Sequence, residues 1–103
     1  MSLIQAIRHK FAADQFELSR HAVDRMLLRD VTVQEVREAM ADGDVIEDYP
    51  QDKYGASCLI LGFTRNGRVL HIQCSYPERP LIKLITVYEP DPAEWINFKA
   101  RVL

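Results

Sequence analysis

The pair Asn66-Gly67 constrains the fold most, because it lies between two segments with the composition of strands, the second of which alternates apolar with polar residues. An Asn-Gly pair at this spacing is a strong β-hairpin signal, since both residues readily adopt positive φ. The flanking segments, Ala56 to Thr64 and Val69 to Tyr76, are therefore predicted strands. A third segment, Leu81 to Tyr88, follows a turn at Pro77 to Pro80 and predicts a three-stranded antiparallel meander.

Helix signals precede the meander. Apolar residues from Leu3 to Ala13 recur at helical spacing, and Phe16 to Leu18 is a short extended link. Ser19 is a predicted N-cap of a helix that runs to about Arg29. Thr32 and Glu35 form a capping box, which predicts a further helix through Met40 that ends before Gly43.

Two further elements complete the expected order. Val45 to Tyr49 is a predicted strand ahead of the meander. Asp91 and Pro92 have the types expected at an N-cap and the first helical position, so a last helix with Trp95, Phe98 and Val102 is predicted. The fold class expected is α+β, with N-terminal helices packed on a four-stranded antiparallel meander and a closing C-terminal helix.

The length of 103 residues is that of a single domain, taken here as residues 1–103. Hydrophobic residues make up 48% and charged residues 27%, which is typical of a globular protein. No apolar run approaches the ~20 residues needed to cross a bilayer. The N-terminus lacks a secretory apolar segment, so we expect a cytoplasmic protein with no membrane partner.

The turn lengths predict a strand register. A two-residue loop at Asn66-Gly67 places Gly62 opposite His71, and a four-residue second turn places Thr86 opposite His71. One face is then polar, with Gly62 leaving a shallow notch, and it also carries Ile82 and Leu84; its polar members are His71, Gln73, Ser75, Thr86 and Tyr88. The opposite face should pack on the helices through Leu59, Leu61, Phe63, Leu70, Ile72, Cys74, Tyr76, Leu81, Ile85 and Val87.

Two interpretations of the polar cluster remain open at this point. It is either a binding or catalytic site, or the solvated outer face that antiparallel sheets commonly have. The same register puts Cys58 and Cys74 on opposite faces, which excludes a disulfide between them.

The helix after Ser19 carries a basic stripe. His21, Arg25 and Arg29 lie at i, i+4 and i+8, and His21 falls in the first turn, where the helix dipole favours an anion. The stripe could hold a phosphate group. Alternatively, it is an ordinary surface whose arginines pair with Asp24 and Asp30.

Charge and motifs exclude several function classes. Residues 1–49 hold six Lys or Arg and ten Asp or Glu, whereas residues 50–103 hold seven and five, and the net charge is −2. This balance argues against tight nucleic-acid binding outside a local basic patch. The chain has no paired Cys or His spacing typical of zinc and no Gly-rich phosphate loop, so neither a metal nor a cofactor is expected.

Several runs together resemble a known family. They are Ser19 to Arg29, Gly43 to Pro50, Leu70-His71-Ile72 and Thr86 to Pro92, followed by Trp95. The chain in this way resembles the bacterial DUF4258 family over roughly residues 16–98. That family is distantly similar to the RelE-like and BrnT-like toxins, so the resemblance implies a RelE-like fold.

The same resemblance implies a function and partners. It suggests a toxin-type ribonuclease acting on RNA, with an antitoxin partner of zinc-finger or helix-turn-helix type. The candidate site residues that it implies are His21, Arg25, Arg29, His71, Thr86 and Tyr88.

Two functional hypotheses follow. In the first, the protein is a metal-independent endoribonuclease, with His21, His71 and Tyr88 as catalytic groups, because histidine suits acid–base work near neutral pH. The expected substrate-binding residues are Arg25, Arg29, Gln73 and Thr86. In the second, the protein is a non-catalytic module that docks a protein through the polar face or the edge strand Val45 to Tyr49.

Overall fold

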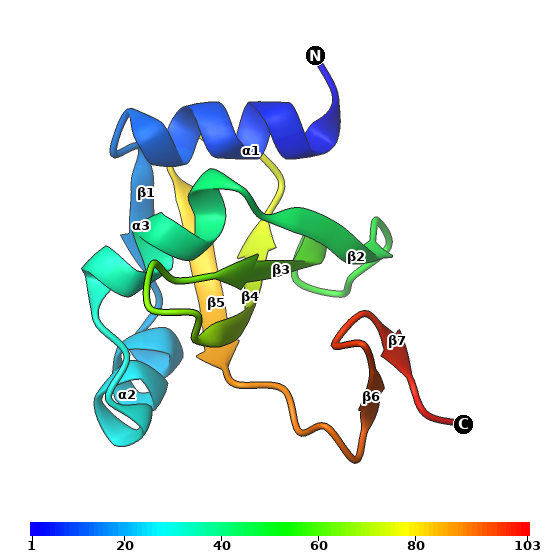
Figure 1. The fold of residues 1–103 in the computed structure, drawn as a ribbon. Coiled ribbons are helices and arrows are strands. Elements are labelled where there is room, and N and C mark those ends of the chain that lie inside the picture. The colour runs from blue at the N-terminus through cyan, green and yellow to red at the C-terminus, as the bar shows by residue number, and fades with distance from the viewer.

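A five-stranded sheet, packed on one face by helices, organises the chain (Figure 1). The computed structural model describes residues 1–103. The helices are α1 (Leu3–Ala12), α2 (Arg20–Arg29) and α3 (Val33–Ala41). The strands are β1 (Phe16–Leu18), β2 (Asp44–Tyr49), β3 (Ser57–Phe63), β4 (Val69–Ser75), β5 (Ile82–Tyr88), β6 (Trp95–Ile96) and β7 (Ala100–Arg101). None of the helices is long and apolar enough to cross a membrane.

The sheet is mixed, in the order β1-β5-β4-β3-β2, and β1 runs parallel to β5. The fold remains α+β, but the prediction of a four-stranded antiparallel meander is wrong. Phe16–Leu18, expected to be a link, pairs with Ile82–Leu84 as a fifth strand. Three residues carry no usable periodicity, and a parallel pairing this distant in sequence has no turn signal to reveal it.

The helix starts follow their caps. Ser19 Oγ accepts a hydrogen bond from the Ala22 amide at 2.9 Å, and Thr32 forms the predicted capping box with Glu35. Asp30 ends α2 in the left-handed conformation, with φ of 55°. The predicted positions of these three helices are confirmed.

The hairpin between β3 and β4 is one residue longer than predicted. The Thr64 amide donates to the Arg68 carbonyl at 2.9 Å, so the loop holds three residues, with Gly67 at φ of 81°. Such a loop is a turn followed by a left-handed glycine, and Thr64 Oγ1 adds a hydrogen bond from the Arg68 amide. Leu61, not Gly62, is therefore opposite His71.

This single-residue shift turns β3 over. Leu59, Leu61 and Phe63 point away from the helices, contrary to prediction. Gly62 lies on the helix side instead of leaving a notch beside His71, and a Cβ there would lie 2.0 Å from the Ala39 carbonyl oxygen. Glycine is needed here because the backbone of α3 touches the strand.

The two cysteines share the helix side. Cys58 is directly opposite Cys74, and both side chains are free and fully buried. The prediction that they lie on opposite faces is wrong for the same reason, the turned-over β3. The hydrogen bond that the Cys74 thiol donates to Cys58 raises the pKa of Cys74 well above its ordinary value, as does burial, so Cys74 stays a neutral thiol.

The pairing of β4 with β5 differs from prediction by an even number of residues. Tyr88 is opposite His71, and Thr86 is opposite Gln73. An even shift keeps these side chains on one face, so the polar cluster survives. A bulge beyond Gln73 then puts Ile82 and Leu84 into the core, although they were expected on the polar face.

The core lies between the sheet and the helices. Sixteen buried residues form one cluster: Ile7, Phe11, Ala22, Met26, Val31, Val36, Ala39, Met40, Cys58, Ile60, Leu70, Ile72, Cys74, Ile82, Leu84 and Val87. All three helices and strands β3, β4 and β5 contribute. We call the other side of the sheet, on which no helix packs, the outer face.

The predicted closing helix is wrong. Asp91 does cap a turn, since its carbonyl accepts from the Glu94 amide at 2.9 Å, but the chain then forms the β6–β7 hairpin. Asn97 and Phe98 make its turn with φ of 52° and 63°. Figure 1 shows this hairpin at the end of an extended link after β5. We call residues 90–103 the strap.

Candidate functional site

His71 lies on the outer face under the strap and has no exposed surface. Its Nε2 is 2.6 Å from the Phe98 carbonyl oxygen, and its Nδ1 is 3.2 Å from the Tyr88 hydroxyl. A carbonyl only accepts, so Nε2 carries the proton and Nδ1 accepts from Tyr88. Both ring nitrogens of His71 are therefore engaged within the protein.

Aromatic packing and one ion pair hold the strap in place. The Trp95 ring stands edge-on to the His71 ring with centroids 4.5 Å apart. Arg101 lies 4.8 Å over the Trp95 ring and forms hydrogen bonds to both carboxylate oxygens of Glu47, at 2.9 and 3.0 Å. The Tyr49 hydroxyl also donates to Glu47.

Burial sets the protonation states at this end of the outer face. It lowers the pKa of His71 and raises that of Tyr88. Hydrogen bonds from Arg101 lower the pKa of Glu47, and burial raises the pKa of Tyr49 to about 12. Near neutral pH, a neutral histidine and a neutral tyrosine thus lie beside a charged Glu47–Arg101 pair.

Gln73 links this end of the outer face to the other. It is opposite Thr86, and its Nε2 donates to Ser57 Oγ at 3.2 Å. Ser57 Oγ in turn donates to Asp52 at 2.9 Å. Gln73 therefore belongs to the polar cluster of His71 and also borders a second, open site.

That second site is a pocket of about 410 Å³, here called the His21 pocket. Its wall combines the start of α2, the outer face of β4 and β5, and the loops after β2 and β4. The lining residues are Ser19, His21, Asp52, Tyr54, Gly55, Ala56, Gln73, Ser75, Tyr76, Glu78, Arg79, Lys83 and Ile85. The volume lies within the range of small-molecule sites and is large enough for one nucleotide.

The pocket contains charged side chains without partners. His21 is exposed, and neither it nor Lys83 makes a side-chain hydrogen bond or ion pair. Glu78 is also exposed and unpaired. Two cationic or proton-donating groups and one carboxylate at a concave surface are suited to bind a phosphate and transfer protons.

The residues of the basic stripe on α2, His21, Arg25 and Arg29, do not all have the same role. His21 and Arg25 are free to bind a phosphate group, whereas Arg29 already has a partner. Arg25 lies one turn after His21, half-buried, and its guanidinium has no partner. Arg29 instead donates to the Val87 carbonyl at 2.7 Å and fastens α2 along β5. The helix borders the outer face, because Ser19 also bonds β5 through its amide and its hydroxyl.

Lys83 and Glu78 were missed by the sequence interpretation. Lys83 sits between Ile82 and Leu84, which had been assigned to the outer face. Once those two are placed in the core, strand alternation alone turns Lys83 outward into the pocket. Glu78 lies in a turn, and no pattern in the sequence marks it.

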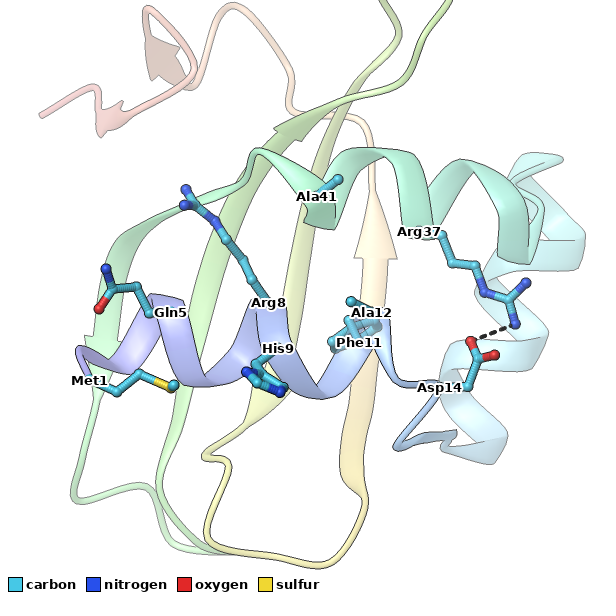
Figure 2. A pocket seen from close by; sticks show the side chains of 9 residues that line it. All are labelled: Met1, Gln5, Arg8, His9, Phe11, Ala12, Asp14, Arg37 and Ala41. Carbon is cyan, nitrogen blue, oxygen red and sulfur yellow. Dashed lines mark ion pairs between the residues drawn. The ribbon is translucent and has the colours of Figure 1, made fainter.

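The structure has no metal-binding cluster, and its widest groove holds arginines that already have partners. No group of three or more His, Cys, Asp or Glu residues is arranged to hold a metal ion. A wider groove of about 1030 Å³ runs between α1 and α3 (Figure 2). Its arginines are already occupied, because Arg8 binds the Gly43 carbonyl at 3.0 Å and Arg37 pairs with Asp14 at 3.1 Å.

A family model described as "Domain of unknown function (DUF4258)" matches residues 18–89, which is most of the chain. The chain belongs to the DUF4258 family. No curated protein and no solved structure matches it.

The family boundary separates the strap from the outer face that it covers. The DUF4258 domain contains every residue that lines the His21 pocket, together with His71 and Tyr88. Trp95, Phe98 and Arg101 lie beyond the matched residues. The strap thus lies outside the matched residues, and it covers one end of the outer face while the other end stays open.

Proposed function

We propose that this DUF4258 protein is a metal-independent endoribonuclease whose reacting phosphate binds in the His21 pocket. The observation that carries the proposal is the meeting of unpaired His21, Lys83 and Glu78 at one concave surface. This proposal includes a distant relationship to RelE-like and BrnT-like toxins. The protein would then be the toxin component of a type II toxin–antitoxin pair in the bacterial cytoplasm.

The proposed reaction needs a base, an acid and positive charge. The Glu78 carboxylate takes the proton of the ribose 2′-hydroxyl, and the 2′-oxygen attacks phosphorus. The bond to the 5′-oxygen breaks, and the His21 imidazolium donates its proton to that leaving oxygen. Lys83 stabilises the negative charge of the phosphorane, and the products are a 2′,3′-cyclic phosphate and a 5′-hydroxyl.

Neighbouring groups would position the substrate. Arg25 offers an unpaired guanidinium one turn beyond His21, which suits the next phosphate along a strand. Tyr54, 87% exposed at the pocket rim, offers a ring on which a base can stack. His71 takes no part in proton transfer in this proposal, because the strap engages its Nε2 and Tyr88 its Nδ1.

The test is cleavage of a single-stranded oligoribonucleotide in the presence of EDTA. The wild type should produce 2′,3′-cyclic phosphate ends, and His21→Ala should slow cleavage by about 100-fold or more. His9→Ala is the matched control, because His9 is also an exposed histidine on a helix and lies outside the pocket. Equal rates for His21→Ala and wild type, or loss of activity in EDTA, would refute the proposal.

A second candidate is a non-catalytic module that binds a protein partner. One observation favours it: α2 exposes Leu27 and Leu28, at 78% and 73%, on its outward side. Neighbouring exposed leucines often mark a protein interface. A stable complex with a neighbouring gene product that is lost in Leu27→Ser, in a protein without nuclease activity, would favour this function over the first.

A further inference from the structure

Every contact named between the strap and the sheet involves at least one side chain, and none joins backbone to backbone. Strands β6 and β7 pair with each other alone, and no backbone hydrogen bond joins residues 90–103 to the five-stranded sheet. The connection rests on His71 with Phe98, on the Trp95 ring and on the Glu47–Arg101 pair. A segment held in this way can be displaced without breaking the sheet.

The strap presents an unusual combination of groups to His71. A flat aromatic ring stands edge-on to the imidazole at 4.5 Å, and a carbonyl oxygen accepts from Nε2 at 2.6 Å. A nucleobase such as uracil combines these features, a flat ring bearing carbonyl acceptors. The groups around His71 are therefore complementary to a base as well as to the strap.

Further groups that could bind the edge of a base surround the same place. The Gln73 amide and the Thr86 hydroxyl lie next to His71 and Tyr88 on the outer face. The Glu47 carboxylate accepts a hydrogen bond from the strap's Arg101 at 2.9 Å, so displacement of the strap would free it. Amides, hydroxyls and carboxylates are the side chains that bind base edges in single-stranded RNA.

A cavity beside the strap adjoins the His21 pocket. A second cleft, of about 680 Å³, is lined by Asp48, Tyr49, Pro50, Gln51, Asp52, Gln73 and Arg101. Asp52 and Gln73 line both cavities, so the two are neighbours on the protein surface, and Arg101 of the strap borders the second. A strand with one phosphate at His21 would reach the strap with a neighbouring nucleotide.

We propose that residues 90–103 occupy, in cis, a nucleobase-binding site on His71, from which single-stranded RNA bound across these two adjoining cavities displaces them. The proposal rests on the proposed function, since it names a second subsite for the same RNA. The strap then acts as an internal competitor that lowers the affinity of the closed protein for RNA.

The sole tryptophan reports on the strap directly. The full chain is titrated with 2′-O-methyl hexauridylate, which binds but cannot be cleaved through its 2′-oxygen. Trp95, 5% exposed in the closed form, should shift its emission to the red as the oligonucleotide binds. An abasic oligomer of equal charge should leave the emission unchanged. Binding without any shift, or an equal shift with the abasic oligomer, would overturn the proposal.

Variants of the full chain test the competition. Trp95→Ala removes the anchor without changing charge, and hexauridylate should bind it about tenfold more tightly than wild type. Ile96→Ala is the control, because Ile96 is 55% exposed in the same strand. Arg101→Gln removes a cation, yet it should also tighten binding by releasing the strap from Glu47. Unchanged or weaker binding in both variants contradicts the proposal.

The two proposals fail separately. If hexauridylate displaces the strap but no RNA is cleaved, the His71 subsite stands and the ribonuclease proposal falls. If RNA is cleaved through His21 while Trp95 stays in place, the ribonuclease proposal stands and the subsite falls.

Discussion

His21 and His71 border the same face of one sheet, but their surroundings are opposite in almost every respect. His71 is fully buried in the middle of β4, with both ring nitrogens bonded. His21 is exposed in the first turn of α2 and has no partner, although Lys83 and Glu78 share its pocket. The comparison shows that a histidine within a cluster of polar residues, such as His71, is not necessarily free to react.

The origin of the difference lies in the strap. Without it, His71, Tyr88 and Gln73 would form an open polar patch like the one at His21. The strap seals that patch, and burial then lowers the pKa of His71. The covered end of the outer face becomes part of the structure, whereas the open end keeps charged groups that no other side chain pairs.

Removing each side chain should separate the two roles. His71→Ala deletes a buried ring with two hydrogen bonds and leaves a cavity under Trp95, so it should lower the free energy of unfolding by about 2–4 kcal/mol. His21→Ala removes an exposed, unbonded side chain and should change the stability by less than about 0.5 kcal/mol. Urea denaturation measures both. Similar losses in the two variants would mean that the contrast is not energetic.

Lys83 tests whether a phosphate group binds in the His21 pocket. Lys83→Ala should weaken binding of an oligoribonucleotide about fivefold and reduce the slope of its salt dependence by about one, because one phosphate contact is lost. Lys99→Ala removes an exposed lysine from the strap and serves as the control. Titrations at several salt concentrations give both quantities. Equal slopes for Lys83→Ala and wild type would place the phosphate elsewhere.

The pH dependence of stability offers the smallest effect. The pKa of His71 in the folded protein lies below its ordinary value of about 6.5. Just below pH 6.5, His71 is therefore protonated in the unfolded chain but still neutral in the folded protein. Its stabilising contribution is complete above that pH and decreases as the pH falls below it. Wild type should therefore lose more stability than His71→Gln between pH 7.5 and 5.5, as measured by urea denaturation. His9 and His21 are common to both proteins, so they cancel.

If wild type and His71→Gln lose the same stability as the pH falls, the pH effect belongs to groups other than His71. Backbone and arginine hydrogen bonds, respectively, lower the pKa values of Glu35 and Glu47 from 4.5. Their stabilisation is present above that pH and is lost as the pH falls further. The two windows are distinct, so a curve measured down to pH 3 separates them.

Local signals predicted the local structure well. The caps at Ser19 and Thr32 placed α2 and α3, and the turn signals between strand-like segments placed β3, β4 and β5. Each of these depends on contacts within a few residues, which a sequence pattern records. The shared face of His71, Gln73, Thr86 and Tyr88 was also predicted, because the register error in β5 was an even number.

Features that depend on distant contacts were not predictable in this way. Asn66-Gly67 fits both a two-residue and a three-residue loop, and the structure has the longer one, in which Thr64 pairs with Arg68. In the longer loop Gly62 can meet Ala39 of α3, which no local pattern reveals. The strap also depends on distant contacts. Trp95 and Phe98 have helical spacing, but their contacts with His71 hold them in a hairpin instead.

Histidine footprinting tests the contrast between the two ends most directly. The folded protein is treated with diethyl pyrocarbonate, with and without 2′-O-methyl hexauridylate, and modified histidines are identified by mass spectrometry. We predict that His9 and His21 react in the free protein while His71 does not, and that the oligonucleotide protects His21 but not His9. Modification of His71 as fast as His9, or no protection of His21, would contradict the account.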